Sequence, residues 1–126
     1  MSPAAPGRRP ERVADLIRSE LSELLVRGAL RDPDAADAYV TAVRVTDDLK
    51  HARVWVQLLR ADVDDRARER VVAALNRASG FLRRELSPRL ALKHQPELRF
   101  HWDEGGERAA RIEELLREDR RGEDPP

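Results

Sequence analysis

The sequence predicts an α+β fold in which helices cover one face of a small three-stranded sheet. Four segments repeat apolar residues at helical spacing, and three others alternate apolar and polar residues as strands do. Each alternating segment has one clear apolar face, so a layer of helices on that side buries the sheet. The predicted order is helix, strand, strand, helix, helix, strand, helix.

The length of 126 residues indicates one domain, and the 40% hydrophobic content indicates a folded one. No cysteine is present, which excludes disulfides, thiolate metal sites and cysteine nucleophiles. No apolar run resembles a signal peptide or a spanning helix, so we expect a cytoplasmic protein without a membrane partner. We expect the domain to span residues 10–118, with disordered tails at 1–9 and 119–126.

The first helix is predicted to begin near Pro10, because proline is favoured in the first helical turn. Gly28 is a typical residue just beyond a helix end, and residues 31–38 follow as a loop. The apolar stripe of this helix comprises Val13, Leu16, Ile17, Leu21, Leu24 and Leu25.

A hairpin follows, with strands at residues 39–46 and 51–59 and a turn at "DDLK" between them. The second strand places Ala52, Val54, Val56 and Leu58 on one face. Trp55 lies on the other face, among polar residues. It either packs under another segment of the chain or stacks on a base, and packing is favoured because RNA-stacking sheets usually carry more than one aromatic residue.

The acids of residues 62–65 can cap the next helix, whose apolar pattern continues to about Pro88. One helix of that length would be about twice the usual 11 to 12 residues. We therefore predict two helices that meet at Ser79 and Gly80. A third strand at residues 95–103 and a final amphipathic helix at residues 107–118 complete the order.

Nothing in the sequence indicates an enzyme. The three histidines show no metal-ligand spacing, and the paired aspartates lie in predicted turns, where aspartate is common for local reasons. No glycine-rich phosphate loop or nucleophile elbow is present. We expect no catalytic residues, no metal, no cofactor and no small-molecule substrate.

The charge pattern favours nucleic-acid contact. The chain is neutral overall, yet residues 66–94 carry eight arginines or lysines against two glutamates. Several of these arginines fall near one helical face at spacings of four and seven: Arg66, Arg70, Arg77 and Arg84. An ordinary solvated helix face mixes both signs, as residues 107–118 do, so RNA binding is favoured over mere solubility.

Gly80 lies on this basic face, between Arg77 and Arg84 and close to Arg83. Without a Cβ it permits a bend and close approach of another backbone, and a helix restarting there would present N–H groups that favour phosphate. Ser79 would cap that helix or bind the ligand. Alternatively, Gly80 is a packing kink that a neighbouring element requires. Local physics leaves these two interpretations equal.

Residues 9–117 resemble the bacterial ribosome-binding factor A family, which has a type II KH fold. The matching segments are "RVADLIRSELSELL", "TDDLKHARVWV", "LNRASGFLRREL", "PELRFHWDE" and "RIEELL". The segment after Trp102 departs from the family pattern at Gly105 and Ala109, as does the "DPDAADAY" loop. The resemblance implies that an Ala-x-Gly kink, here Ala78 to Gly80, replaces the KH loop that clamps about four nucleotides.

The resemblance further implies a monomeric factor that binds the free small (30S) ribosomal subunit and its ribosomal RNA during late maturation, often under cold stress. The residues implied to face RNA are Arg77, Ala78, Ser79, Gly80, Arg83, Arg84, Arg89, Lys93, Lys50 and His51. Two other functions stay open. One is a KH module for free single-stranded RNA, and the other is a protein-binding adaptor that uses Trp55 and the final helix.

Overall fold

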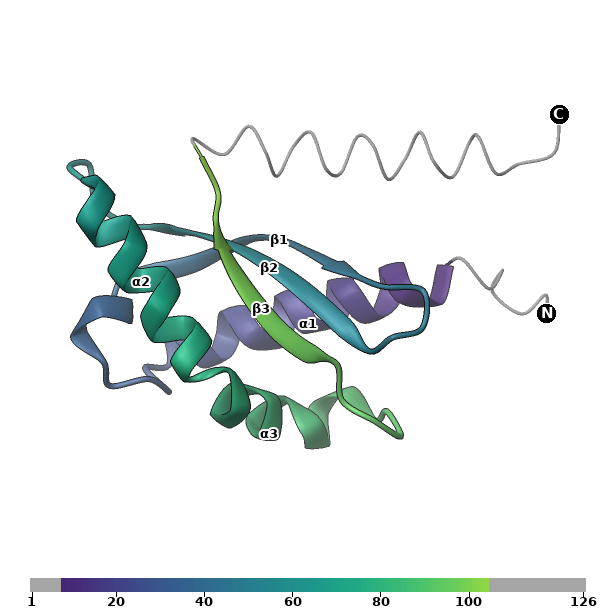
Figure 1. Ribbon diagram of the computed structural model, residues 1–126. Coiled ribbons are helices and arrows are strands. Elements are labelled where there is room, and N and C mark those ends of the chain that lie inside the picture. Colours follow the sequence, from purple (N-terminus) through teal and green to yellow (C-terminus); the bar gives the residue numbers. More distant parts are fainter. Residues whose placement is uncertain (1–7, 105–126) are drawn as a thin grey trace, which may run out of the picture.

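In the computed structural model, which describes residues 8–104, helices pack against one face of a three-stranded sheet (Figure 1). The helices are α1 (Arg8–Val26), α2 (Asp65–Arg77) and α3 (Ser79–Leu90), with a short 3₁₀ turn, η1, at Pro33–Ala35. The strands are β1 (Ala38–Val45), β2 (His51–Leu58) and β3 (Glu97–Trp102), in the spatial order β1-β2-β3. The predicted α+β class is confirmed.

The hydrophobic core lies between the inner face of the sheet and the three helices. The predicted stripe of α1 supplies Ile17, Leu21 and Leu24, all fully buried. Two other residues of that stripe are less buried: Leu16 is 38% exposed, and Leu25 is partly buried. The other elements add fully or almost fully buried side chains that include Val54, Val56, Val71, Leu75, Leu82, Leu86 and Phe100. Burial of this apolar surface is the main force that holds the layers together.

Two boundaries differ from the prediction. Helix α1 begins at Arg8, so Arg8 and Arg9 are helical and not part of a tail. Pro10 is tolerated at the third helical position because N–H groups of the first turn have no helical acceptor. Helix α3 continues past Pro88 to Leu90, which is buried. The predicted helix at 107–118 and the predicted tails, apart from Arg8 and Arg9, lie outside the described residues.

The hairpin is confirmed, with antiparallel register from Ala38 opposite Leu58 to Val45 opposite Ala52. Its turn is held by Asp48, whose carboxylate accepts the Thr46 hydroxyl at 2.6 Å and the Lys50 N–H at 3.0 Å. Leu49 takes a left-handed conformation, with φ of 61°. These two hydrogen bonds, the Thr46 bond first, lower the pKa of Asp48 from its ordinary value.

Strand β3 pairs in parallel with β2 and lies at an edge of the sheet. Asn76 of α2 covers part of its free edge. The Asn76 side chain accepts from the Phe100 N–H at 2.8 Å and donates to the Phe100 carbonyl at 3.2 Å. One side chain thus takes the place of a neighbouring strand and fixes the end of α2 against the sheet.

Trp55 packs on the other face of the sheet. It is 6% exposed and forms a small cluster with Ala42, separate from the main core. Its ring centroid lies 5.6 Å from that of His101 in β3. This burial agrees with the packing interpretation and leaves little of the indole available to a base.

Candidate nucleic-acid interface

The break between the two basic helices lies at Ala78, one residue before the predicted position. Ala78 has φ of −88° and ψ of 1°, and it is at once the end of α2 and the start of α3. Its N–H still donates to the Ala74 carbonyl at 3.1 Å, and its own carbonyl accepts from Leu82 at 2.9 Å. The prediction that the helices meet at Ser79 and Gly80 is wrong, because rotating one ψ angle turns the chain without needing glycine.

Ser79 does not cap the new helix, contrary to one of the two roles considered for it. It is the first residue of α3, and no side chain caps that helix. The first turn also contains no acidic residue. The N–H groups and the positive end of the helix dipole are therefore not neutralised by a neighbouring carboxylate in that turn.

Gly80 is exposed, and no packing constraint requires it. A Cβ placed there would meet only the flexible Arg84 side chain, with Nη1 at 3.6 Å, an ordinary van der Waals distance. Among the described glycines, Gly28 has a positive φ and Gly80 does not. The packing interpretation, in which a sheet or helix passes tightly against Gly80, is therefore wrong.

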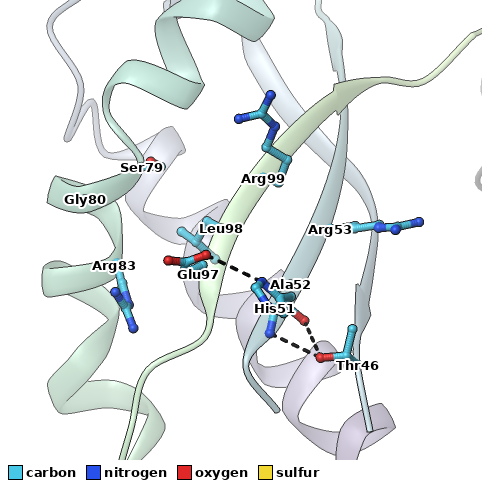
Figure 2. Close-up of a pocket in the computed structure, with 10 residues that line it drawn as sticks. All are labelled: Thr46, His51, Ala52, Arg53, Ser79, Gly80, Arg83, Glu97, Leu98 and Arg99. Carbon is cyan, nitrogen blue, oxygen red and sulfur yellow. Dashed lines mark hydrogen bonds and ion pairs between the residues drawn. The ribbon is translucent and has the colours of Figure 1, made fainter. Parts of the chain in front are cut away.

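A pocket of about 530 Å³ separates the start of α3 from strands β2 and β3 (Figure 2). It brings together four of the ten predicted site residues: His51, Ser79, Gly80 and Arg83. The other residues of its lining are not among the predicted site residues: Thr46, Ala52, Arg53, Glu97, Leu98 and Arg99. Strand alternation could have identified Arg53 and Arg99 as exposed, but only the register shows that they are neighbours.

Two polar contacts shape this pocket. Arg83 donates from Nε to the Gln95 carbonyl at 3.0 Å, and its Nη2 donates to the same oxygen. This contact holds α3 to the segment that leads into β3. On the strand side, His51 Nδ1 lies 3.5 Å from a Glu97 carboxylate oxygen, and both side chains are more than half exposed.

Several predicted RNA-facing arginines are already paired within the protein. Nη2 of Arg77 lies 3.4 Å from Oδ2 of Asp32. Nη1 of Arg89 lies 2.7 Å from Oε2 of Glu20 and 3.6 Å from Oε2 of Glu23. The hydrogen bond with Glu20 raises the pKa of Arg89. This last contact joins α3 to α1.

The remaining predicted cations lie outside the pocket lining. Arg84, Lys50 and Lys93 are exposed and make no ion pair within residues 8–104. Arg84 is nonetheless beside Gly80, as the 3.6 Å approach shows. The predicted cations therefore differ: some have no acidic partner within residues 8–104, Arg77 and Arg89 are paired with acids, and Arg83 binds a backbone carbonyl.

Two further features concern metal binding and membrane crossing. Within residues 8–104, no three histidine, aspartate or glutamate side chains gather where a metal ion could bind. Over the same residues, no helix is both long and apolar enough to cross a bilayer.

The element order, with β3 parallel to β2 and two helices joined by one non-helical residue, defines the class as an α+β domain of the type II KH kind. The family model of ribosome-binding factor A matches residues 9–116. The chain belongs to the ribosome-binding factor A family.

Relatives agree with this assignment. Ribosome-binding factor A of Syntrophobacter fumaroxidans is 42% identical over 111 residues, 88% of this chain and 93% of the relative. That of Anaeromyxobacter dehalogenans strain 2CP-C is 46% identical over 119 residues, 93% of this chain and 83% of the relative.

Solved structures agree as well. The crystal structure of ribosome-binding factor A from Thermus thermophilus matches with a TM-score of 0.58 and 27% identity, covering 72% of this chain and 92% of that one. A homology model of the Thermus thermophilus factor, fitted into a cryo-EM map of its complex with the 30S subunit, has a TM-score of 0.50 and 29% identity. It covers 68% of this chain and 91% of that one.

Proposed function

We propose that this protein is a non-enzymatic assembly factor that binds the free small ribosomal subunit in the cytoplasm during late maturation. Its contact with ribosomal RNA is made by the α2–Ala78–α3 face. The family assignment supports this proposal, as does the related Thermus factor fitted into a map of a 30S complex. Cold stress, when RNA refolds slowly, is the condition under which such a factor is most needed.

The observation that carries the proposal is the exposed Gly80, where a Cβ would meet only the flexible side chain of Arg84. A phosphate group can approach the backbone there, at the uncapped start of α3. The guanidinium of Arg84 supplies a forked donor for the same anion. Glycine is thus explained by ligand access, since neither packing nor φ requires it.

The predicted residues take different roles in this contact. Arg84, Lys50 and Lys93 are free to bind phosphate, and Arg77 does so by exchanging Asp32 for RNA. Arg83 is a positioning residue, because its bonds to Gln95 fix the wall of the pocket. Arg89 serves mainly to join α3 to α1 through its acidic partners.

Charge reversal on this face tests the proposal. The double variant Arg77→Glu, Arg84→Glu is expected to lose co-sedimentation with free small subunits while its circular dichroism spectrum stays that of the folded protein. The matched control reverses two arginines away from the kink, Arg12→Glu and Arg60→Glu, and is expected to bind. Unchanged binding of the kink variant would contradict an RNA-binding role for this face and favour the adaptor alternative.

The preference of the protein for one binding partner over another gives a second test. The protein is expected to bind free small subunits more tightly than mature whole ribosomes, and to bind short unstructured RNAs weakly, because the KH clamping loop is replaced by the kink. Equal binding to subunits and whole ribosomes would count against a maturation role. Tight binding to the short RNAs would favour the single-stranded RNA module instead.

The absence of cysteine from the chain allows a direct map of the contact. A hydroxyl-radical probe tethered at Glu85→Cys, next to Arg84, is expected to cleave ribosomal RNA in the complex. The same probe at Asp15→Cys, an exposed position on α1, is expected to cleave it weakly or not at all. Equal cleavage from both positions would disagree with the proposed orientation.

A further inference from the structure

Three arginines form one row across the sheet. The register places Arg44 of β1 opposite Arg53 of β2, and Arg53 beside Arg99 of β3. All three side chains are exposed, on the face of the sheet opposite α1, α2 and α3. Adjacent strands lie about 4.8 Å apart, so the row is roughly 10 Å wide.

Like charges directly opposite one another destabilise a sheet. None of the three arginines makes a hydrogen bond or ion pair with another side chain in residues 8–104. This differs from the kink region, where acidic residues neutralise Arg77 and Arg89. Three arginines without an acidic partner in residues 8–104 therefore lie side by side on this face of the sheet.

The row is continuous with the pocket at the kink. Arg53 and Arg99 both line that pocket together with Ser79 and Gly80 (Figure 2). A chain held at the start of α3 therefore reaches the row by crossing β3. The occupant has to carry closely spaced negative charges, and guanidinium groups match phosphate oxygens in a forked geometry.

We propose that the Arg44–Arg53–Arg99 row is a second phosphate-binding surface, which takes the backbone of one RNA strand that passes from the kink over β3. This proposal rests on the proposed function and extends its RNA path beyond the helices. Recognition on the row is independent of base identity, because Trp55, the aromatic residue next to it, is buried. The sheet face therefore adds affinity and orientation without reading sequence.

The test is the salt dependence of binding. The variant Arg44→Gln, Arg53→Gln, Arg99→Gln removes three charges and the repulsion between them, so it is expected to fold. Each lost contact to single-stranded RNA changes the slope of log K against log salt concentration by about 0.7. We expect that slope, measured with free small subunits, to become shallower by about 2, and affinity at low salt to fall by about tenfold or more.

The matched control is Arg12→Gln, Arg27→Gln, Arg60→Gln, which makes the same change in net charge with three exposed arginines outside the sheet face. Its slope is expected to equal that of the unmodified protein. The same measurements are made on protein-free small-subunit RNA, where the sheet variant is expected to show the same reduction in slope.

Three results would overturn the proposal. One is an unchanged slope for the sheet variant. Another is an equal reduction for the control, which would indicate an effect of net charge alone. The third is weaker binding to subunits with unchanged binding to the naked RNA, which would show that the row contacts a protein. If the sheet variant keeps its slope while the kink charge reversal abolishes binding, the sheet path fails and the proposed function stands.

Discussion

At the scale of single residues, Gly80 is the position where sequence and structure disagree in the most informative way. Glycine within a helix lowers stability relative to alanine, and the structure shows neither a positive φ nor a close neighbour that would demand it. The bend itself belongs to Ala78. A position that weakens the fold without a structural need is a strong candidate for a functional one.

We therefore expect Gly80→Ala to stabilise the protein and to weaken its binding. The free energy of unfolding should rise by about 0.5–1 kcal/mol, because alanine favours the helix and its Cβ has room. Affinity for small subunits should fall, because the Cβ blocks approach of phosphate to the backbone. Urea unfolding and co-sedimentation measure the two effects.

The control is Ala73→Gly, an exposed position within α2, which should lower stability by a similar amount and leave binding unchanged. If Gly80→Ala binds as tightly as the unmodified protein, the backbone at residue 80 does not contact the ligand.

At the level of secondary-structure elements, polar side chains attach the two helices at the kink to the rest of the fold. Asn76 attaches the last turns of α2 to β3, and Arg83 attaches α3 to the segment before β3. Arg89 joins α3 to α1. Each half of the helix pair is thus attached to the rest of the fold by its own contacts, with Ser79 and Gly80 lining the pocket.

Asn76→Ala removes both bonds to Phe100 and should lower the free energy of unfolding by about 1–3 kcal/mol, because the edge of β3 loses a donor and an acceptor at once. Chemical unfolding measures the loss. Asn76→Asp keeps an acceptor for the Phe100 N–H but brings a carboxylate to its carbonyl, so it should not restore stability. If either variant unfolds with the same free energy as the unmodified protein, the bonds between Asn76 and Phe100 do not stabilise the edge of β3.

The hairpin turn gives a prediction about pH. Thr46→Val removes the strongest cause of the lowered pKa of Asp48, so that pKa should rise towards 3.8, as followed by NMR titration of the carboxyl group. The control is Thr41→Val. The Thr41 hydroxyl donates to the Trp55 carbonyl in β2, away from the turn, so its removal should leave the pKa of Asp48 unchanged.

A carboxylate with a lowered pKa stabilises the fold above its unfolded pKa, and this contribution fades as pH falls through the folded value. The stability difference between the unmodified protein and Thr46→Val should therefore be greatest at neutral pH and shrink below about pH 4. A difference that is constant through this range would show that the Asp48 contact does not contribute.

At the scale of the whole molecule, the two tryptophans report on the two faces of the sheet. Trp102 packs against the main core, while Trp55 belongs to the small cluster with Ala42. Trp55 lies in β2 and Trp102 in β3. These two strands are hydrogen-bonded to each other, and Trp102 is paired with Val56, the residue after Trp55. The same backbone hydrogen bonds hold the residues of both faces in place, so we expect the packing of the two faces to be lost together.

We therefore expect one cooperative unfolding transition. In Trp55→Phe only Trp102 fluoresces, and in Trp102→Phe only Trp55 does. Within each variant, the fluorescence midpoint in urea should coincide with the circular dichroism midpoint. A Trp55 transition that precedes loss of secondary structure would show that the outer cluster opens on its own.

Local sequence patterns were enough to predict the element order within residues 8–104, the inner apolar faces, the hairpin and the basic character of the helix pair, because each depends on a local repeat of residue types. Family resemblance then indicated the KH class. Which cations are free depends on the folded chain, since Asp32 reaches Arg77 and Glu20 reaches Arg89 from distant parts of the sequence. The fold also leaves only the Arg84 side chain near the place of a Cβ on Gly80, and it brings Arg44, Arg53 and Arg99 into one row. Pairing and register are relations between segments, and no local pattern encodes them.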